Sequence, residues 1–178
     1  MKTFLKFIVS IIVIALIIGT VLFLLTNKEE YNQDNSNYNV EEVIENIQKI
    51  EKDNNEAVDI KTFEDNVDVE IMGTKNKAFF ESFEIDETTV SIKTSGTMVY
   101  IIPNSDFMDN AQYHYDESGN LVLYVCELIG VGGEIRYYYK DENFIKNEFL
   151  IEEGISLDTE DVNEILQRSK VIYQKYIK

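Results

Sequence analysis

His114 and Cys126 are each the only residue of their type in this 178-residue chain. A zinc site of the usual kind needs several His or Cys side chains, so one of each does not supply a ligand set. The residues around Cys126 include no group that would lower the pKa of its thiol. We therefore expect Cys126 to be a small buried hydrophobic residue, and His114 to be an ordinary residue facing solvent.

Acidic side chains gather at residues 65–70, 106–109 and 158–161. Carboxylate oxygens are the ligands of Ca²⁺, but the spacing of an EF-hand loop with its central Gly is absent. We read these groups as solvated charge and leave Ca²⁺ binding open, with the loop at residues 104–110 as the best cation candidate.

No pattern of a known catalytic centre stands out. A pair of carboxylates that cleaves glycosides is defined by its distance in space, and no pair is singled out by the sequence. There is no Gly-rich phosphate loop before a helix and no Gly-x-Ser-x-Gly elbow. The sequence thus predicts no catalytic, cofactor-binding or metal-binding residue, and no cofactor.

The charge balance limits the partners. The formal net charge is −17, and hydrophobic residues make up 44% of the chain, enough to form a core. Phosphate binding needs clustered Lys and Arg, so nucleic acid is not an expected partner. An acidic surface instead suits solubility, a cation or a basic partner. A single Cys also means that no disulfide forms within the chain.

Residues 7–25 form an uncharged, mainly aliphatic run of 19 residues. As a helix it would be roughly 28 Å long, close to the thickness of a bilayer. Lys2 and Lys6 precede the run, and every Asp and Glu follows it, so we expect the N-terminus in the cytoplasm and the rest outside. The alternative is a cleaved signal peptide, whose apolar core is shorter and ends in a small-x-small site that is missing here.

We therefore divide the chain into a transmembrane signal-anchor at residues 1–26, a polar tether at 27–39, and an extracytoplasmic domain at 40–178. The domain should begin and end with amphipathic helices. The first, at residues 40–56, has Asn39 as its expected N-cap, and the second, at 159–177, has Asp158. The apolar stripes are Val40, Val43, Ile44, Ile47 and Ile50 in the first helix, and Val162, Ile165, Leu166, Ser169, Ile172, Tyr173 and Tyr176 in the second.

A strand–turn–strand pattern recurs between these helices. Four copies begin 23, 23 and 24 residues apart, at residues 67–73, 90–98, 113–121 and 137–145. Their seventh position is Gly73, Gly96, Gly119 or Asn143, residues that tolerate the left-handed backbone of a hairpin turn. The repeat predicts an antiparallel meander. Its strands are expected near residues 58–63, 67–72, 78–85, 89–94, 97–102, 111–116, 121–128, 134–140 and 144–151.

The motif Tyr-x-Tyr-Asp-x-x-Gly-Asn-Leu at residues 113–121 resembles the tyrosine–glycine hairpins of the YD-repeat and MORN-like families. The chain is also similar to membrane-anchored exported proteins of unknown function from low-GC Gram-positive bacteria. The resemblance covers residues 90–151, and only the third copy has the acid after the second Tyr. It implies a β-meander and assigns no functional residue.

The alternation of residues on the strands predicts a sheet covered on one side by the helices. Tyr113, Tyr115, Ile135, Tyr137 and Tyr139 should share one face, and His114, Glu134, Arg136, Tyr138 and Lys140 the other. The fold class is then α+β: a transmembrane helix, followed by a meander of about seven to nine strands packed with an N-terminal and a C-terminal helix.

With no catalytic pattern, the expected function is a non-catalytic binding module at the cell envelope, with a protein, a peptide or a wall component as partner. The alternatives are a hydrolase that uses carboxylates on the envelope, and a structural subunit of a membrane complex.

Overall fold

The computed structural model describes residues 39–73, 80–104, 108–130, 132–151 and 159–178. Within these residues no helix is both long enough and apolar enough to cross a bilayer. The predicted transmembrane segment and all but the last residue of the predicted tether lie outside the described part of the chain.

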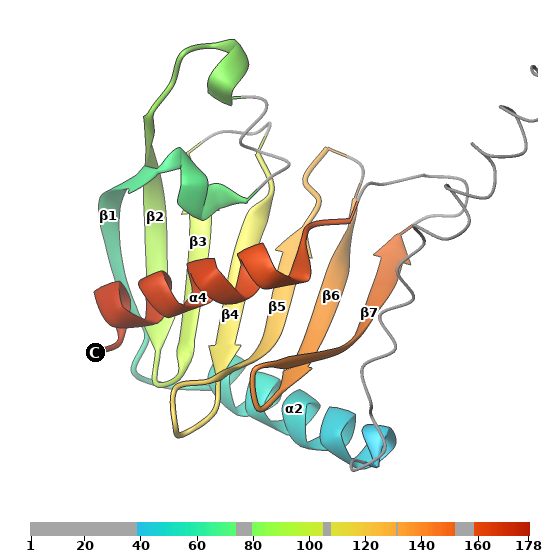
Figure 1. Cartoon of the computed structure of the whole chain (residues 1–178). Helices are drawn as coiled ribbons and strands as arrows, with labels where there is room; N and C mark the ends of the chain where they lie inside the picture. Colours follow the sequence, from blue (N-terminus) through green and yellow to red (C-terminus); the bar gives the residue numbers. More distant parts are fainter. Residues whose placement is uncertain (1–38, 74–79, 105–107, 131, 152–158) are drawn as a thin grey trace, which may run out of the picture. The chain divides into compact units, whose positions relative to one another are not determined.

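A seven-stranded antiparallel sheet forms the centre of the domain, and the strands follow one another in space in the order of the sequence (Figure 1). This confirms the predicted meander and the α+β class. The strands are β1 Lys61–Asp68, β2 Glu87–Ser95, β3 Met98–Pro103, β4 Asn110–Tyr115, β5 Leu121–Glu127, β6 Gly133–Lys140 and β7 Asn143–Ile151.

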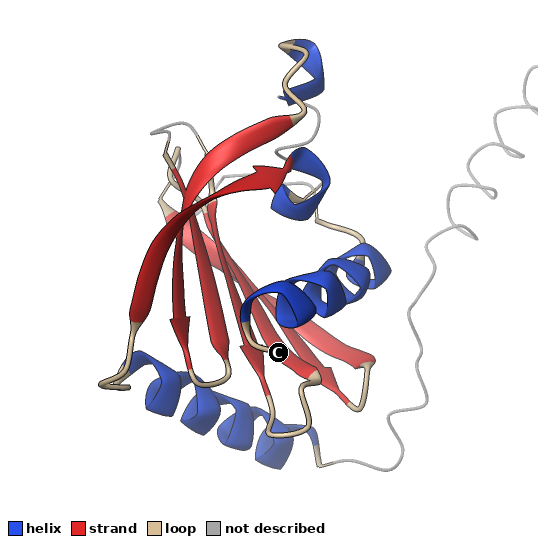
Figure 2. Cartoon of the chain, turned by 90° about the vertical axis from the view of Figure 1, so that its left-hand side faces the viewer, coloured by secondary structure: helices blue, strands red, loops and turns tan. Residues whose placement is uncertain are grey.

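Two helices cover opposite faces of this sheet (Figure 2). They are α2, Val40–Asn55, and α4, Val162–Tyr176, close to the predicted ranges. The prediction that helices cover only one side is therefore wrong. The reason is that both sets of alternating residues on the central strands contain large apolar side chains, so both faces need cover.

The α4 face holds the main core. Tyr113, Tyr115, Ile135, Tyr137 and Tyr139 all lie in it, as their alternation predicted. The stripe of α4 completes this core, because Ile165 and Ile172 are fully buried against it. Apolar burial stabilises a fold by about 25 cal/mol per Å², so a core of this many buried side chains is a major source of stability.

The α2 face holds a smaller apolar patch. Ile47 is buried there, and Val43, Ile44 and Ile50 of the predicted stripe pack around it. A bulge pairs His114 with Leu123 and Tyr115 with Leu121, and both Val122 and Leu123 of β5 then contribute to this patch. The extra residue widens the apolar surface that receives α2.

The first hairpin copy is not a hairpin. Residues 58–63 and 67–72 were expected to be two strands, but β1 runs through Lys61–Asp68 and a 3₁₀ helix, η1, follows at Val69–Met72. Val69 and Met72 are both buried in the α4-face core. Residues three apart align on a 3₁₀ helix but point to opposite faces of a strand, which explains the change.

The strand expected at residues 78–85 is also absent from its described part, because a helical turn begins at Phe80 and β2 starts at Glu87. Two turn predictions are confirmed, since Gly96 and Gly119 have positive φ between paired strands. The turn prediction for the fourth copy, at Asn143, is wrong. Asp141 and Glu142 have positive φ, and Asn143 already begins β7. A two-residue turn of this kind needs positive φ at both central residues.

Candidate functional site

Cys126 is buried on the α4 face, as expected. His114 is fully buried too, so its predicted solvent exposure is wrong. The cause is α2: its Asn54 lies against His114, with 3.3 Å between Asn54 Nδ2 and His114 Nδ1. Since His114 faces α2 and Cys126 faces α4, they lie on opposite faces of the sheet and do not form a catalytic pair.

The His114 ring belongs to a continuous chain of hydrogen bonds. Thr97 Oγ1 donates to Asn54 Oδ1 at 3.0 Å, and the Asn54 amide then faces His114 Nδ1. His114 Nε2 lies 3.2 Å from Gln112 Oε1. These partners fit a neutral ring with its proton on Nε2. Burial, with a smaller effect of the nearby Arg136 charge, lowers the pKa of His114 to about 4.

The chain ends on the Glu127 carboxylate. Gln112 donates to Glu127 Oε1, while Tyr100 and Asn110 donate to Glu127 Oε2 at 2.6 and 2.9 Å. Beside it, Arg136 forms a bidentate ion pair with Glu51 of α2, with nitrogen–oxygen distances of 3.0 and 2.6 Å. Each of these groups has a partner within the protein. This network positions α2 on the sheet and leaves no group spare for a ligand.

The acidic clusters do not form a metal site in the described regions. No three His, Cys, Asp or Glu side chains there are grouped closely enough to hold a metal ion. Asp161 accepts hydrogen bonds from the amides of Asn163 and Glu164 and so caps α4. The predicted N-cap, Asp158, is wrong, because α4 begins at Val162 and Asp161 is its N-cap. Of the cation candidate at residues 104–110, residues 105–107 lie outside the described residues. Asn39 does cap α2 by position, but its side chain makes no capping bond.

A buried ion pair under α4 is the most unusual feature of the domain. Arg168 Nη2 lies 2.5 Å from Glu160 Oε2, and the two side chains are 9% and 3% exposed. Tyr124 donates to Glu160 Oε1 at 2.8 Å, and the Glu160 amide donates to the Tyr137 hydroxyl at 3.0 Å. Buried charges are stable only when paired and hydrogen-bonded, and these tyrosines supply the bonds.

The pair is not fully satisfied. Arg168 Nε and the Tyr113 hydroxyl are enclosed, and neither has a hydrogen-bond partner of good geometry among the described residues, although the two side chains interact with each other. Burial raises the pKa of Tyr113, and burial together with the Glu160 charge raises that of Tyr124. Both hydroxyls therefore keep their protons at neutral pH. The guanidinium also lies over the Tyr124 ring, 5.7 Å from its centre.

Gly73, just after η1, closes over this pair. Its φ is +93°, and a Cβ there would lie 2.7 Å from Glu160 Oε2 and 3.2 Å from Arg168 Nη2. Both the backbone conformation and the lack of space require glycine. The end of η1 thus approaches the ion pair as closely as a main chain can, and η1 and α4 are held side by side.

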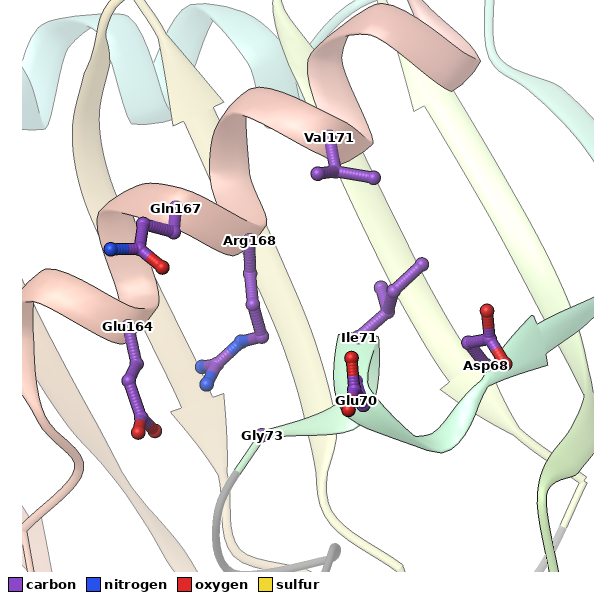
Figure 3. A pocket seen from close by; sticks show the side chains of 8 residues that line it. All are labelled: Asp68, Glu70, Ile71, Gly73, Glu164, Gln167, Arg168 and Val171. Carbon is purple, nitrogen blue, oxygen red and sulfur yellow. The ribbon is translucent and has the colours of Figure 1, made fainter.

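Between η1 and α4 lies a cavity of about 380 Å³, which we call the η1–α4 pocket. Figure 3 shows Arg168 reaching from α4 toward η1, with Glu164 on the same helix beside it. The lining residues are Asp68, Glu70, Ile71, Gly73, Glu164, Gln167, Arg168 and Val171. The pocket therefore combines three carboxylates, one guanidinium, one amide and two aliphatic side chains.

Among the described residues, the lining has no Ser, Thr, Cys, His or Lys, so the groups that it offers for binding or for chemistry are its carboxylates and Arg168. Sequence reasoning noted the acids at residues 65–70 but did not single out Arg168. A signal was present: Arg168 stands three residues after Ile165 and four before Ile172, on the apolar stripe itself. An arginine at such a position requires a buried acidic partner.

Comparisons with known proteins give no relative. The chain matches no model of a protein family, and neither a curated protein nor a solved structure is significantly similar to it.

Proposed function

We propose that this protein is a membrane-anchored, extracytoplasmic and non-catalytic binding module that holds a partner protein or peptide at the η1–α4 pocket. The observation that carries the proposal is the incompletely satisfied Arg168 at this pocket. Ligand sites combine apolar walls with a few placed polar groups. The η1–α4 pocket has both, whereas the network on the α2 face has used its polar groups internally.

Three carboxyl groups outside the η1–α4 pocket do not fit the general acid of a carboxylate-based hydrolase. A general acid needs a carboxyl group with a raised pKa. The pKa is lowered at Glu64 by hydrogen bonds from Asn104 and Ser91, at Asp65 by Lys175, and at Glu148 by Lys146.

The anchor is proposed from the uncharged run at residues 7–25 and the two lysines before it. Full-length protein should sediment with membranes, and deletion of residues 1–27 should release a soluble, folded domain. A protease added to intact cells should remove the domain from the full-length protein. A protected domain would reverse the orientation, and an insoluble or unfolded shortened chain would contradict the one-domain organisation.

Binding at the pocket is tested by photo-crosslinking in intact cells. A photoreactive amino acid replaces Gln167, which is exposed and lines the pocket, or Glu45, which is exposed on α2. We expect a discrete crosslinked species from position 167 and none from position 45. Equal patterns from both positions, or none from either, would refute a binding site at the pocket. A species that forms equally well after Arg168→Met would place the partner elsewhere.

A further inference from the structure

We propose that strand β7 pairs with β7 of a second copy of this chain, so that two sheets join edge to edge. The proposal goes beyond the binding function above and does not depend on it. The η1–α4 pocket is lined from the end of β1, at the opposite edge of the sheet (Figure 1). Two observations carry the proposal: the apolar edge that β7 presents, and an order of charges on β7 that complements itself.

The two edge strands of the sheet differ in how they are protected. Among the described strands, β1 pairs only with β2 and β7 only with β6, so each has one side without a neighbouring strand. Charged side chains on an edge strand discourage pairing with another chain. Four of the eight residues of β1 are charged, but only two of the nine in β7. Near its end, β7 also exposes 43% of Phe149 and 53% of Leu150. β7 is therefore the edge that is suited to pairing.

The two charged side chains of β7 lie on the same face of the sheet. Lys146 is paired with Tyr138 on the α2 face, and Glu148 follows two residues later on that face. Asn147 between them is paired with Tyr137 on the α4 face. Lys146 and Glu148 form an ion pair along the strand, and their side chains stay 36% and 35% exposed. Both charges are therefore near enough to solvent to meet a neighbouring strand.

The order of these residues selects one register. When a strand pairs antiparallel with its own copy, one residue lies opposite itself and its flanking residues lie opposite each other. With Asn147 in the centre, Lys146 of each copy lies opposite Glu148 of the other, which makes two pairs of opposite charge. A centre at Glu148 or at Lys146 would instead place like charges opposite each other. The charges of β7 thus favour a second copy of β7, centred on Asn147.

The exposed aromatic side chain also finds a partner in this register. The pairing of β6 with β7 passes over Ile145, so that Tyr139 lies opposite Phe144. A second copy that makes the same step brings its Phe149 opposite Phe144. Both side chains lie on the α4 face, since Phe149 is paired with Ile135 and Phe144 packs on the core there. Aromatic cross-strand pairs stabilise a sheet, so the pairing covers the apolar surface at the end of β7.

Disulfide trapping tests the pairing in purified full-length protein in neutral detergent. In the proposed register the two thiols of Asn147→Cys lie opposite each other, at the Cα separation of about 4.5–5.5 Å that a disulfide can bridge. We expect a covalent dimer after mild oxidation, on a gel run without reductant. Thr62→Cys, exposed on β1, is the matched control at the other edge. Wild-type protein reports on the buried Cys126 and should stay monomeric.

Charge reversal tests the register. Lys146→Glu and Glu148→Lys are each combined with Asn147→Cys and carry tags of different size. Alone, each variant places like charges opposite each other, and the dimer yield should fall about tenfold. Mixed, the two variants again place opposite charges together, and the mixed dimer should form as readily as with Asn147→Cys alone. Neither variant keeps the ion pair along its own strand, so recovery in the mixture reports on contacts between copies.

Three results would overturn the proposal. Equal dimer yields from Thr62→Cys and Asn147→Cys would show random collision between copies. No dimer from Asn147→Cys would exclude a second copy and leave the β7 edge to an extended segment of another protein. Yields that do not respond to the charge reversals would remove the register centred on Asn147.

Discussion

Each face of the sheet has a network built around an arginine, partly buried on the α2 face and buried on the α4 face, and the two networks compensate the charge differently. On the α2 face, Arg136 has both ends of its guanidinium bound to Glu51 and Glu134. On the α4 face, Arg168 forms an ion pair with Glu160, and its Nε–H has no acceptor of good geometry among the described residues. The first network positions a helix, and the second keeps hydrogen-bonding capacity at a pocket. A network in which every polar group has a partner is structural, whereas one with an unsatisfied polar group at a pocket is a candidate site.

The largest expected effect tests this difference directly. Arg168→Met leaves the Glu160 carboxylate buried without its counter-charge, and the free energy of unfolding should fall by about 3–5 kcal/mol. Arg136→Met on the other face should cost about 2 kcal/mol, because Glu51 keeps 14% of its side chain exposed to solvent. Urea denaturation of both variants measures the two values.

The double variant Glu160→Gln/Arg168→Met is the control. It removes both charges, so it should be more stable than Arg168→Met alone. If the double variant is as unstable as the sum of the single variants, the two side chains do not act as a pair.

The second comparison concerns the apolar layers. Ile165→Ala removes a fully buried side chain from the large α4-face core and should cost about 4 kcal/mol. Ile47→Ala removes the central side chain of the smaller α2-face patch and should cost about 2 kcal/mol. Thermal and urea unfolding give both. Equal losses would mean that the two helices are held equally firmly.

The third prediction concerns the turn between β4 and β5. Gly119 has φ +86°, and a Cβ there would lie 2.5 Å from Tyr173 Cζ on α4. Gly119→Val should therefore cost about 3 kcal/mol, through backbone strain and through displacement of Tyr173. Ser118→Ala next to it should change stability by less than about 0.5 kcal/mol. Similar shifts in melting temperature for both would contradict the role of this turn in placing α4.

The fourth prediction concerns pH and the α2 face. His114 stays neutral in the folded protein to about pH 4, since burial lowers its pKa, while in the unfolded chain it takes a proton near pH 6.5. The unfolded chain then binds more protons between these values, so stability falls as the pH falls from 6.5 to 4. We expect a loss of about 2 kcal/mol between pH 7 and pH 5 from this residue.

His114→Gln separates this effect from the titration of carboxyl groups. Glutamine can accept from Asn54 and donate to Gln112 but carries no proton that titrates in this range. The difference in unfolding free energy between wild type and variant should therefore shrink as the pH is lowered from 7 to 5. A difference that stays constant over this range would show that folding does not lower the pKa of His114.

Much of the architecture could be predicted because local patterns and tertiary packing agree. The stripe around Ile47 and the alternation around Tyr113 and Tyr137 each correspond to a buried surface. The predictions failed where a distant element decides the outcome. The local sequence predicts a surface position for His114, but α2 places Asn54 beside it. Residues 113–121 alone do not predict that contact.

The candidate site was harder to predict for a related reason. Its residues come from the end of β1, from η1 and from α4, about a hundred positions apart. The 3₁₀ helix replaces an expected strand because Val69 and Met72 both enter the core, a fact that depends on the position of the whole sheet. The local signal for this site was Arg168, because a charged residue on the apolar stripe of a helix indicates a buried ion pair.

The order of the strands has a consequence for folding kinetics. Each strand pairs with its neighbours in the sequence, and several turns are short, so most pairings close small loops at little entropic cost. The link from β1 to β2 is the exception, because η1 and the residues up to Glu87 separate the two strands. We expect β2 to β7 to assemble first and β1 with η1 to join later. The η1–α4 pocket would then be the last part of the domain to form and the first to open.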